Sequence, residues 1–259
     1  MTDDVAFGTG GLLADEASLH LMDLAEAMRS LSVHVGGADD SSLERLVDTA
    51  AAHIPGVRWA SVTTLRAGRF RTEASSDPAA ARADAIQYEV GAGPCVDAVL
   101  EEHVLVVEDL EHDARWPEFA ARAREEVGVA GVLAYRLTLQ SDSPAIACLN
   151  AYSATVGAVD DASVATGLVL ATHASLLVSA VLDRERAHHL ERALRSNREI
   201  GVAMGVLMQR HGLSREQAFD VLRVASQDSN RKLADLAVEV ADTGTIALRR
   251  WPPSVPRRE

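Results

Sequence analysis

The sequence contains few cysteines, few aromatic residues and a single lysine. Its 259 residues include two cysteines, Cys95 and Cys148, one lysine, Lys232, and 4% aromatic side chains. Two cysteines do not supply the framework of a disulfide-rich protein, and neither lies in a metal-ligand spacing. We therefore expect a fold held together by an apolar core, in a reducing environment.

Motifs of the common enzyme classes are also absent. The chain has no P-loop, no GxGxxG after a predicted strand, no HExxH and no GxSxG. The adjacent His188 and His189 fall on a highly charged stretch, which favours solvated side chains over a metal site. The sequence gives no support for an enzyme or a metal centre, and no residue set selects a cofactor.

The composition is that of a folded protein with an uneven charge distribution. Hydrophobic residues make up 47% and charged residues 24% of the chain, whose net charge is −13. Residues 1–183 carry a net charge of −17, whereas residues 184–259 carry +4. A polyanion would therefore be bound locally, at the C-terminal end. The alternative is that these basic residues only balance the surface of a helical module.

One stretch has the length of a transmembrane helix. Residues 162–182 contain no formal charge. They include Ser163, Thr172 and His173 and are rich in alanine, which favours a buried helix–helix interface. No basic residue precedes Arg29, so the pattern of a secretory signal is absent. We expect a cytoplasmic protein.

Hydrophobic periodicity predicts an α+β domain in the first part of the chain. Apolar spacing of three and four predicts helices over 12–35 and from Ser41 or Ser42 to His53. Residues 115–129 are expected to be helical at their centre. Alternating, β-branched runs predict strands at 57–65, 69–75, 104–107, 131–139 and 145–153. Strands flanked by helices indicate an antiparallel-sheet domain.

The last third reads as helix. One helix is predicted over about 160–210, with a narrow apolar stripe of Leu190, Ala193 and Leu194 that favours a coiled-coil seam between two chains and hence a homodimer. After Gly212, Ser214 and Gln217 form a capping box. The next helix directs four residues inward, and a third opens at Ser229-Asn230 and closes before Gly244. The inward residues are Ala218, Phe219, Leu222 and Ala225, then Leu233, Leu236, Ala237 and Val240.

Residues 196–241, "SNREIGVAMGVLMQRHGLSREQAFDVLRVASQDSNRKLADLAVEVA", resemble an ANTAR domain. That family is a three-helix module that binds paired RNA hairpins in leader transcripts and prevents transcription termination. Residues 40–182 resemble a GAF domain, a sensory α+β fold. The segments that carry this resemblance are "GAGPC", "VLVVEDL", "RWPEF" and the final hairpin. The resemblance implies five segments: a tail and helix (1–39), a GAF-like sensor (40–160), a connecting coiled-coil helix (161–195), an ANTAR module (196–244) and a disordered tail (245–259).

The ANTAR resemblance directs attention to one helix face and to the basic residues of the module. Glycine costs about 1 kcal/mol relative to alanine inside a helix, so Gly201 and Gly205 require a reason. Tight helix packing is one reason, and close approach of an RNA loop is the other. Many ANTAR modules have glutamine and lysine where this chain has Val202 and Met204, which implies that this chain contacts RNA through different side chains. The RNA-binding candidates are Arg198, Gly201, Ala203, Gly205, Gln209, Arg215, Arg223, Ser226, Asn230, Arg231 and Lys232.

Arginine suits such a site because its planar fork binds phosphate and stacks on bases. Phe219 is the one aromatic residue of the three helices and is expected in the core, which excludes an aromatic stacking platform. Two other functions stay open, a DNA-binding regulator and a GAF-dependent dimerisation protein without RNA activity.

The GAF resemblance implies a small-molecule ligand, for which Gly93 and Cys95 are the candidates, and its identity is unknown. Cys95 lies at a predicted helix start, where a thiolate is favoured, so it is either a redox residue or a small buried one.

Overall fold

A computed structural model describes residues 22–31, 40–101, 104–140 and 145–246. The chain divides into two compact units, Met1–Arg184 and Glu185–Glu259. The two units are described separately below. Residues 1–21 and 32–39 of the predicted N-terminal tail and helix, and residues 247–259 of the predicted disordered tail, lie outside the described residues.

The first unit contains a five-stranded antiparallel sheet with strand order β2-β1-β5-β4-β3. Each strand falls where the alternating pattern predicts one, and the predicted α+β fold class is confirmed. The strands are β1 (Trp59–Arg66), β2 (Arg69–Ser75), β3 (Val104–Val107), β4 (Gly131–Leu137) and β5 (Ile146–Ser153).

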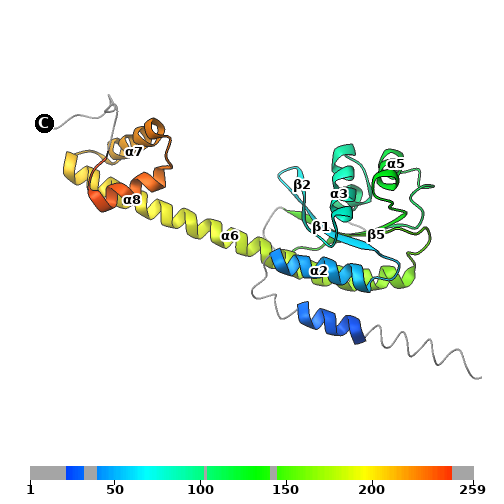
Figure 1. Cartoon of the computed structure of the whole chain (residues 1–259). Helices are drawn as coiled ribbons and strands as arrows, with labels where there is room; N and C mark the ends of the chain where they lie inside the picture. The colour runs from blue at the N-terminus through cyan, green and yellow to red at the C-terminus, as the bar shows by residue number, and fades with distance from the viewer. Residues whose placement is uncertain (1–21, 32–39, 102–103, 141–144, 247–259) are drawn as a thin grey trace, which may run out of the picture. The chain divides into compact units, whose positions relative to one another are not determined.

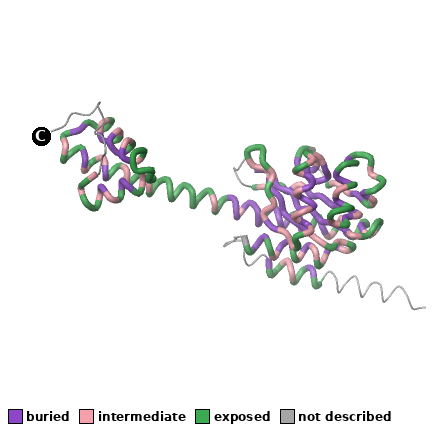
Figure 2. Tube along the Cα trace, turned by 45° about the horizontal axis from the view of Figure 1, so that its top comes forward, coloured by how far each residue is buried: buried purple, intermediate pink, exposed green. Residues whose placement is uncertain are grey.

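Helices cover both faces of this sheet (Figure 1). On one face, α2 (Asp40–His53) and the first part of α6 (Asp161–His211) pack with the helix over residues 22–31 against a core that includes Leu46, Leu149 and Leu177. On the other face lie α3 (Pro78–Val90), α4 (Pro94–Glu101) and α5 (Pro117–Glu126). Buried residues therefore lie on both sides of the strands, and Figure 2 shows them in the interior of this unit.

The periodicity analysis did not find helix α3. Its sequence, PAAARADAIQYEV, buries the polar Asp84 and Gln87 beside Ala80, Ala83 and Ile86, so the apolar face is interrupted. Local signals at its ends were nevertheless present. The Asp77 side chain accepts a hydrogen bond from the backbone of Ala79, Pro78 opens the helix, and Gly91 closes it with φ +73°.

The predicted long helix is confirmed as α6, and the uncharged part of it packs inside the first unit. Leu170, Ala174, Leu177 and Val178 are buried against the sheet. By length and composition α6 could cross a membrane, but half of its most apolar window is buried. That burial is the behaviour expected of the core helix of a sheet domain, in agreement with the sequence analysis.

Two helices follow α6 in the second unit. Gly212 lies just after α6 with φ +64°, and the capping box between Ser214 and Gln217 begins α7 (Arg215–Ser229) as predicted. The predicted start of the third helix is wrong: Asn230, in the left-handed conformation at φ +51°, caps the end of α7, and α8 (Leu233–Thr243) begins three residues later. Gly244 ends α8 as predicted.

Candidate nucleic-acid interface and sensor site

The second unit is built on a small apolar core shared by α6, α7 and α8. Its buried members are Ala203, Leu207, Leu213, Ala218, Val221, Leu222, Ala237 and Val240. Phe219, predicted to be inside, is exposed and retains 42% of its accessible surface. The buried residues of α7 follow the spacing 218, 221, 222 and 225, and Phe219 lies beside that face, so the helical period turns it outward.

The surroundings of Gly201 and Gly205 in α6 test whether tight helix packing explains these two glycines. A Cβ atom placed on Gly201 or Gly205 meets no heavy atom within 4 Å. Tight packing against another part of the described chain is therefore excluded, and the space beside these glycines is open. Ala203, by contrast, is fully buried, so its side chain is not accessible to RNA; its expected role in binding is corrected to one in the core.

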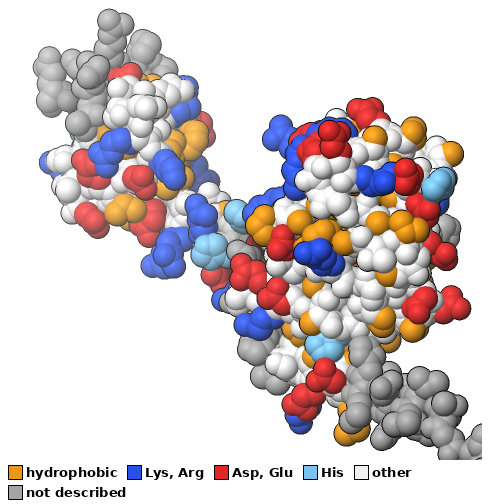
Figure 3. Space-filling view, turned by 45° about the vertical axis from the view of Figure 1, so that its right-hand side comes forward, with side chains coloured by type: hydrophobic (Ala, Val, Ile, Leu, Met, Phe, Trp, Pro, Cys, Tyr) orange, Lys and Arg blue, Asp and Glu red, His pale blue; other side chains and the backbone are white. Residues whose placement is uncertain are grey.

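The basic residues of the module differ in how far they are engaged. Arg223 pairs with Asp220 at 3.0 Å, and Arg210 donates to the backbone oxygen of Gly244 at 2.9 Å. Within the described residues, Arg198 and Lys232 take part in no ion pair, and both are exposed. Figure 3 shows Lys and Arg side chains interspersed with acidic ones on this unit. The predicted contacts therefore include both free and engaged cations.

Four predicted contact residues gather at the junction of α7 and α8. The Ser226 hydroxyl donates to the backbone oxygen of Arg231 at 2.6 Å, which fixes the turn, and Asn230 caps α7. Lys232 occupies the residue before α8. On α6, Arg198 and Gln209 are exposed on the same side of the helix as the two glycines, and Arg215 is exposed at the start of α7.

The most unusual polar group of the sheet domain is Asp84 on α3, which is fully buried against the strands. Its Oδ1 accepts hydrogen bonds from Ser61, Asn150 and Tyr152, and its Oδ2 accepts one from Thr72. Burial raises the pKa of Asp84 to about 6, and these hydrogen bonds act in the opposite direction. Asp84 therefore joins α3 to strands β1, β2 and β5 through a hydrogen-bond network that the sequence patterns did not reveal.

Both predicted ligand residues, Gly93 and Cys95, lie close to the side chain of Gln87. Its Oε1 accepts from the backbone amide of Cys95 at 2.8 Å, and a Cβ on Gly93 would lie 2.4 Å from the same oxygen. Cys95 is fully buried, and burial raises the pKa of Cys148, with the nearby Cys95 adding to the effect. This environment favours small buried thiols over an exposed reactive thiolate. Within the described residues, no group of three or more His, Cys, Asp or Glu could hold a metal ion.

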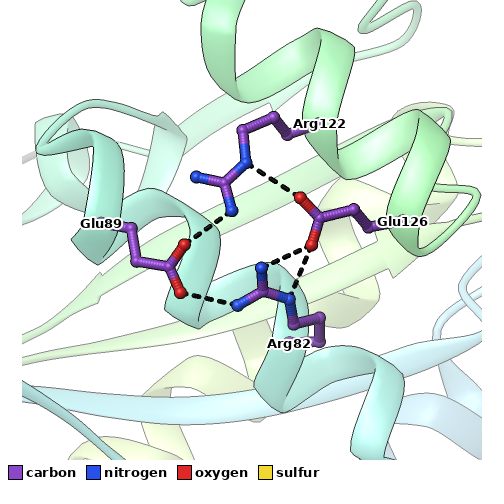
Figure 4. Close-up of polar contacts among 4 residues, drawn as sticks. All are labelled: Arg82, Glu89, Arg122 and Glu126. Carbon is purple, nitrogen blue, oxygen red and sulfur yellow. Dashed lines mark hydrogen bonds and ion pairs between the residues drawn. The ribbon is translucent and has the colours of Figure 1, made fainter.

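A closed ring of ion pairs joins α3 to α5 on the same side of the sheet (Figure 4). Arg82 bonds both Glu89, at 2.7 Å, and Glu126, and Arg122 bonds the same two carboxylates at 2.6 and 2.9 Å. The hydrogen bonds from both arginines lower the pKa of Glu89 to about 2. Because all four side chains reach solvent, the ring positions the helices and adds little to stability.

Comparisons with known proteins agree with this division. Residues 188–240 match the ANTAR domain family. No curated protein sequence matches the chain. Similar solved structures include the GAF domain of a phosphoenolpyruvate-protein phosphotransferase from Coxiella burnetii, at 15% identity and TM-score 0.48, covering 65% of this chain and 98% of that one. A GAF sensor protein from Burkholderia vietnamiensis gives 15% and 0.48, with 66% and 98% covered.

A free methionine-R-sulfoxide reductase from Thermoplasma acidophilum is similar at 17% identity and TM-score 0.42, with 53% of this chain and 90% of that one covered. Such distant likeness gives no information on ligand or activity. The chain thus carries an α+β sheet domain followed by a C-terminal segment, residues 188–240, that matches the ANTAR domain family.

Proposed function

We propose that this chain is an RNA-binding transcription regulator whose ANTAR domain stabilises paired hairpins in leader transcripts and so prevents termination. The observation that carries the proposal is the match to the ANTAR family over residues 188–240. The exposed residues around α6 and the α7–α8 junction offer hydrogen-bond donors and cations, as recognition of a small RNA loop requires. Such a mechanism needs no chemistry on the protein, so we propose no enzymatic activity, and a cytoplasmic location.

The proposed contacts are the accessible members of the predicted set. Arg198 and Lys232 supply cations that pair with no acidic side chain of the described part of the chain, and Arg215, Gln209 and Asn230 supply further polar groups. The exposed ring of Phe219 adds a surface on which one base can stack, which is a correction to the expectation of a wholly non-aromatic contact. With so few cations, a single module binds weakly and with a marked salt dependence.

Two modules in one dimer compensate for this weakness, because the second hairpin then binds at a high effective concentration. We propose a homodimer formed through α6, whose Leu190 and Leu194 each expose 61% of their surface. The GAF-like domain controls the dimer because α6 is one helix that begins in the core of the sheet domain and ends in the ANTAR domain. A ligand beside Gly93 and Cys95 would act by moving α4.

The decisive experiment measures binding of the full chain to an RNA pool carrying two small hairpins with randomised loops. A pool with one hairpin and duplex DNA of equal charge serve as controls, each at two salt concentrations. The expected result is enrichment of particular loops, tighter binding to paired hairpins and weakening by salt and by Lys232→Ala. Preference for duplex DNA would support the DNA-binding alternative. Absence of binding to all three would support a dimerisation protein without RNA activity.

A further inference from the structure

The two cysteines of the chain meet in one buried cluster beneath α4. Cys95 is the second residue of α4, and Cys148 lies in β5. Both are free thiols, and both are fully buried in the same apolar cluster, which also contains Ala98, Val99 and Ala134. Because the sequence has no other cysteine, each of these thiols has only the other as a possible partner within the chain.

Thr63 of β1 locates the two sulfur atoms relative to each other. Thr63 is the register partner of Cys148, so their side chains lie on the same face of the sheet with Cβ atoms about 5 Å apart. The Thr63 hydroxyl is also 3.1 Å from the Sγ atom of Cys95. Both thiols therefore adjoin one side chain, on the face of the sheet that α4 covers. Burial raises the pKa of Cys148, and the neighbouring Cys95 thiol raises it further, in agreement with this proximity.

We propose that Cys95 and Cys148 form a reversible disulfide bond when the protein meets hydrogen peroxide, and that this bond fastens α4 to β5. The bond belongs to the sheet domain and does not depend on RNA binding by the second unit. In a reducing environment both thiols stay free, which is the state that the structure holds. Since each thiol is at a high effective concentration for the other, oxidation of one sulfur leads to the bridge.

The reaction consumes one hydrogen peroxide and releases two water molecules. Cys95 reacts first, because the raised pKa of Cys148 keeps that thiol protonated. The Cys95 sulfur, having lost its proton, attacks a peroxide oxygen, the O–O bond breaks, and Cys95 becomes a sulfenic acid while the first water leaves. The Cys148 sulfur then attacks the Cys95 sulfur, and the hydroxyl leaves with the Cys148 proton as the second water. The two sulfur atoms together lose the two electrons that the peroxide gains.

The bridge also changes the hydrogen bonds of the core. In the reduced chain the Cys148 thiol donates to Oδ1 of Asn150 at 3.1 Å, and the Asn150 amide donates to Asp84 and Ser61. A disulfide has no S–H group, so Asn150 loses this donor on oxidation. A covalent link from α4 to β5 also removes the local openings in which α4 leaves the sheet. Oxidation therefore acts on α4 and on the side chains that hold Asp84.

Peptide mapping of the full wild-type chain tests the proposal. Reduced protein is treated with hydrogen peroxide under native conditions, then unfolded, and its free thiols are blocked with N-ethylmaleimide. We expect a bridged pair of peptides that contain Cys95 and Cys148, lighter by two hydrogen atoms and separated by dithiothreitol. Three results would overturn the proposal: sulfinic or sulfonic acid at one cysteine with the other free, disulfides between two chains, or two free thiols after a treatment that oxidises the urea-unfolded chain.

Two matched variants test whether the bridge restrains α4. Cys95→Ser and Cys148→Ser keep a small hydrogen-bonding group at each position and cannot form the bridge. On oxidation we expect amide hydrogen exchange in α4 to slow by about tenfold in wild type and to stay unchanged in both variants. Equal slowing in either variant would show that peroxide acts on α4 by another route. None of these measurements uses RNA, so their outcome is independent of the proposed function.

Discussion

Arg231, in the connection between α7 and α8, forms a 2.6 Å ion pair with Glu239 of α8. Its neighbour Lys232 takes part in no ion pair within the described residues. The two adjacent cations therefore start from different states. In the proposed RNA complex, a phosphate has to compete with Glu239 for Arg231, whereas Lys232 has no such competitor among the described residues.

Replacement of Glu239 should strengthen RNA binding. Glu239→Gln releases Arg231, so we expect an affinity gain and a steeper dependence of log affinity on log salt, by about one unit. Lys232→Ala should make that dependence shallower by about one unit. Salt titrations of RNA binding measure both. Asp242→Asn removes an equal charge from the same helix and serves as the control; an equal gain there would mean that net charge, and not release of Arg231, is responsible.

Phe219→Ala should separate binding from stability. A buried phenylalanine would lose about 3–5 kcal/mol on truncation. Because Phe219 is 42% exposed, we expect a smaller cost in unfolding free energy, about 1 kcal/mol. If the ring stacks on a base, RNA affinity falls by about 1–3 kcal/mol. Val238→Ala, at the same 42% exposure on α8, is the control for loss of an apolar group. Equal losses of affinity in both variants would contradict a stacking role.

Much of the fold follows from periodicity, because strands and amphipathic helices with one buried face leave a repeating signal. All five strands and α6 are examples. Helix α3 was not predicted because the residues it buries include Asp84 and Gln87. A pattern of apolar residues does not reveal buried polar groups whose hydrogen-bond partners lie on distant strands. Only the three-dimensional pairing with Ser61, Asn150 and Tyr152 explains their burial.

The candidate site was predicted less completely than the fold. Residue type and family resemblance identified the glycines and the cations. Whether a helical side chain is exposed, however, changes from one residue to the next, because successive side chains point about 100° apart. Phe219 was expected in the core and is 42% exposed, and Ala203, included among the RNA-binding candidates, is fully buried. Ion pairing of Arg231 also could not be predicted, since its partner lies eight residues away on the next helix.

Disruption of the ion-pair ring should loosen α5 without unfolding the domain. Glu89→Gln weakens one carboxylate link to both Arg82 and Arg122, so we expect faster amide hydrogen exchange in α5 and little change in the unfolding midpoint. Glu125→Gln, on α5 and outside the ring, is the control. The difference between these variants should shrink in 1 M NaCl, at a Debye length of about 3 Å, because the ring is exposed. Identical exchange in both variants would show that the ring does not restrain α5.

The buried Asp84 predicts how stability of the sheet domain changes with pH. Its pKa rises from an ordinary 3.8 to about 6 in the folded state, so between these values the unfolded chain has lost the proton that the folded chain retains. The contribution of this group to stability is therefore greatest at low pH and falls as pH rises from about 4 to 6, by roughly 3 kcal/mol. Above pH 6 both states are ionised and the contribution is constant.

Asp84→Asn should remove this pH dependence, because the amide is neutral throughout. Its oxygen can still accept from Ser61, Asn150 and Tyr152, and its nitrogen can donate to the Thr72 hydroxyl, so the network has a satisfied arrangement. Urea unfolding between pH 4.5 and 7.5, followed by tryptophan fluorescence, should show wild type losing stability relative to the variant as pH rises. The exposed Asp48→Asn is the control and should follow wild type. Parallel curves for wild type and Asp84→Asn would mean that Asp84 is ionised in the folded domain across this range, and that the hydrogen bonds to its carboxylate outweigh its burial.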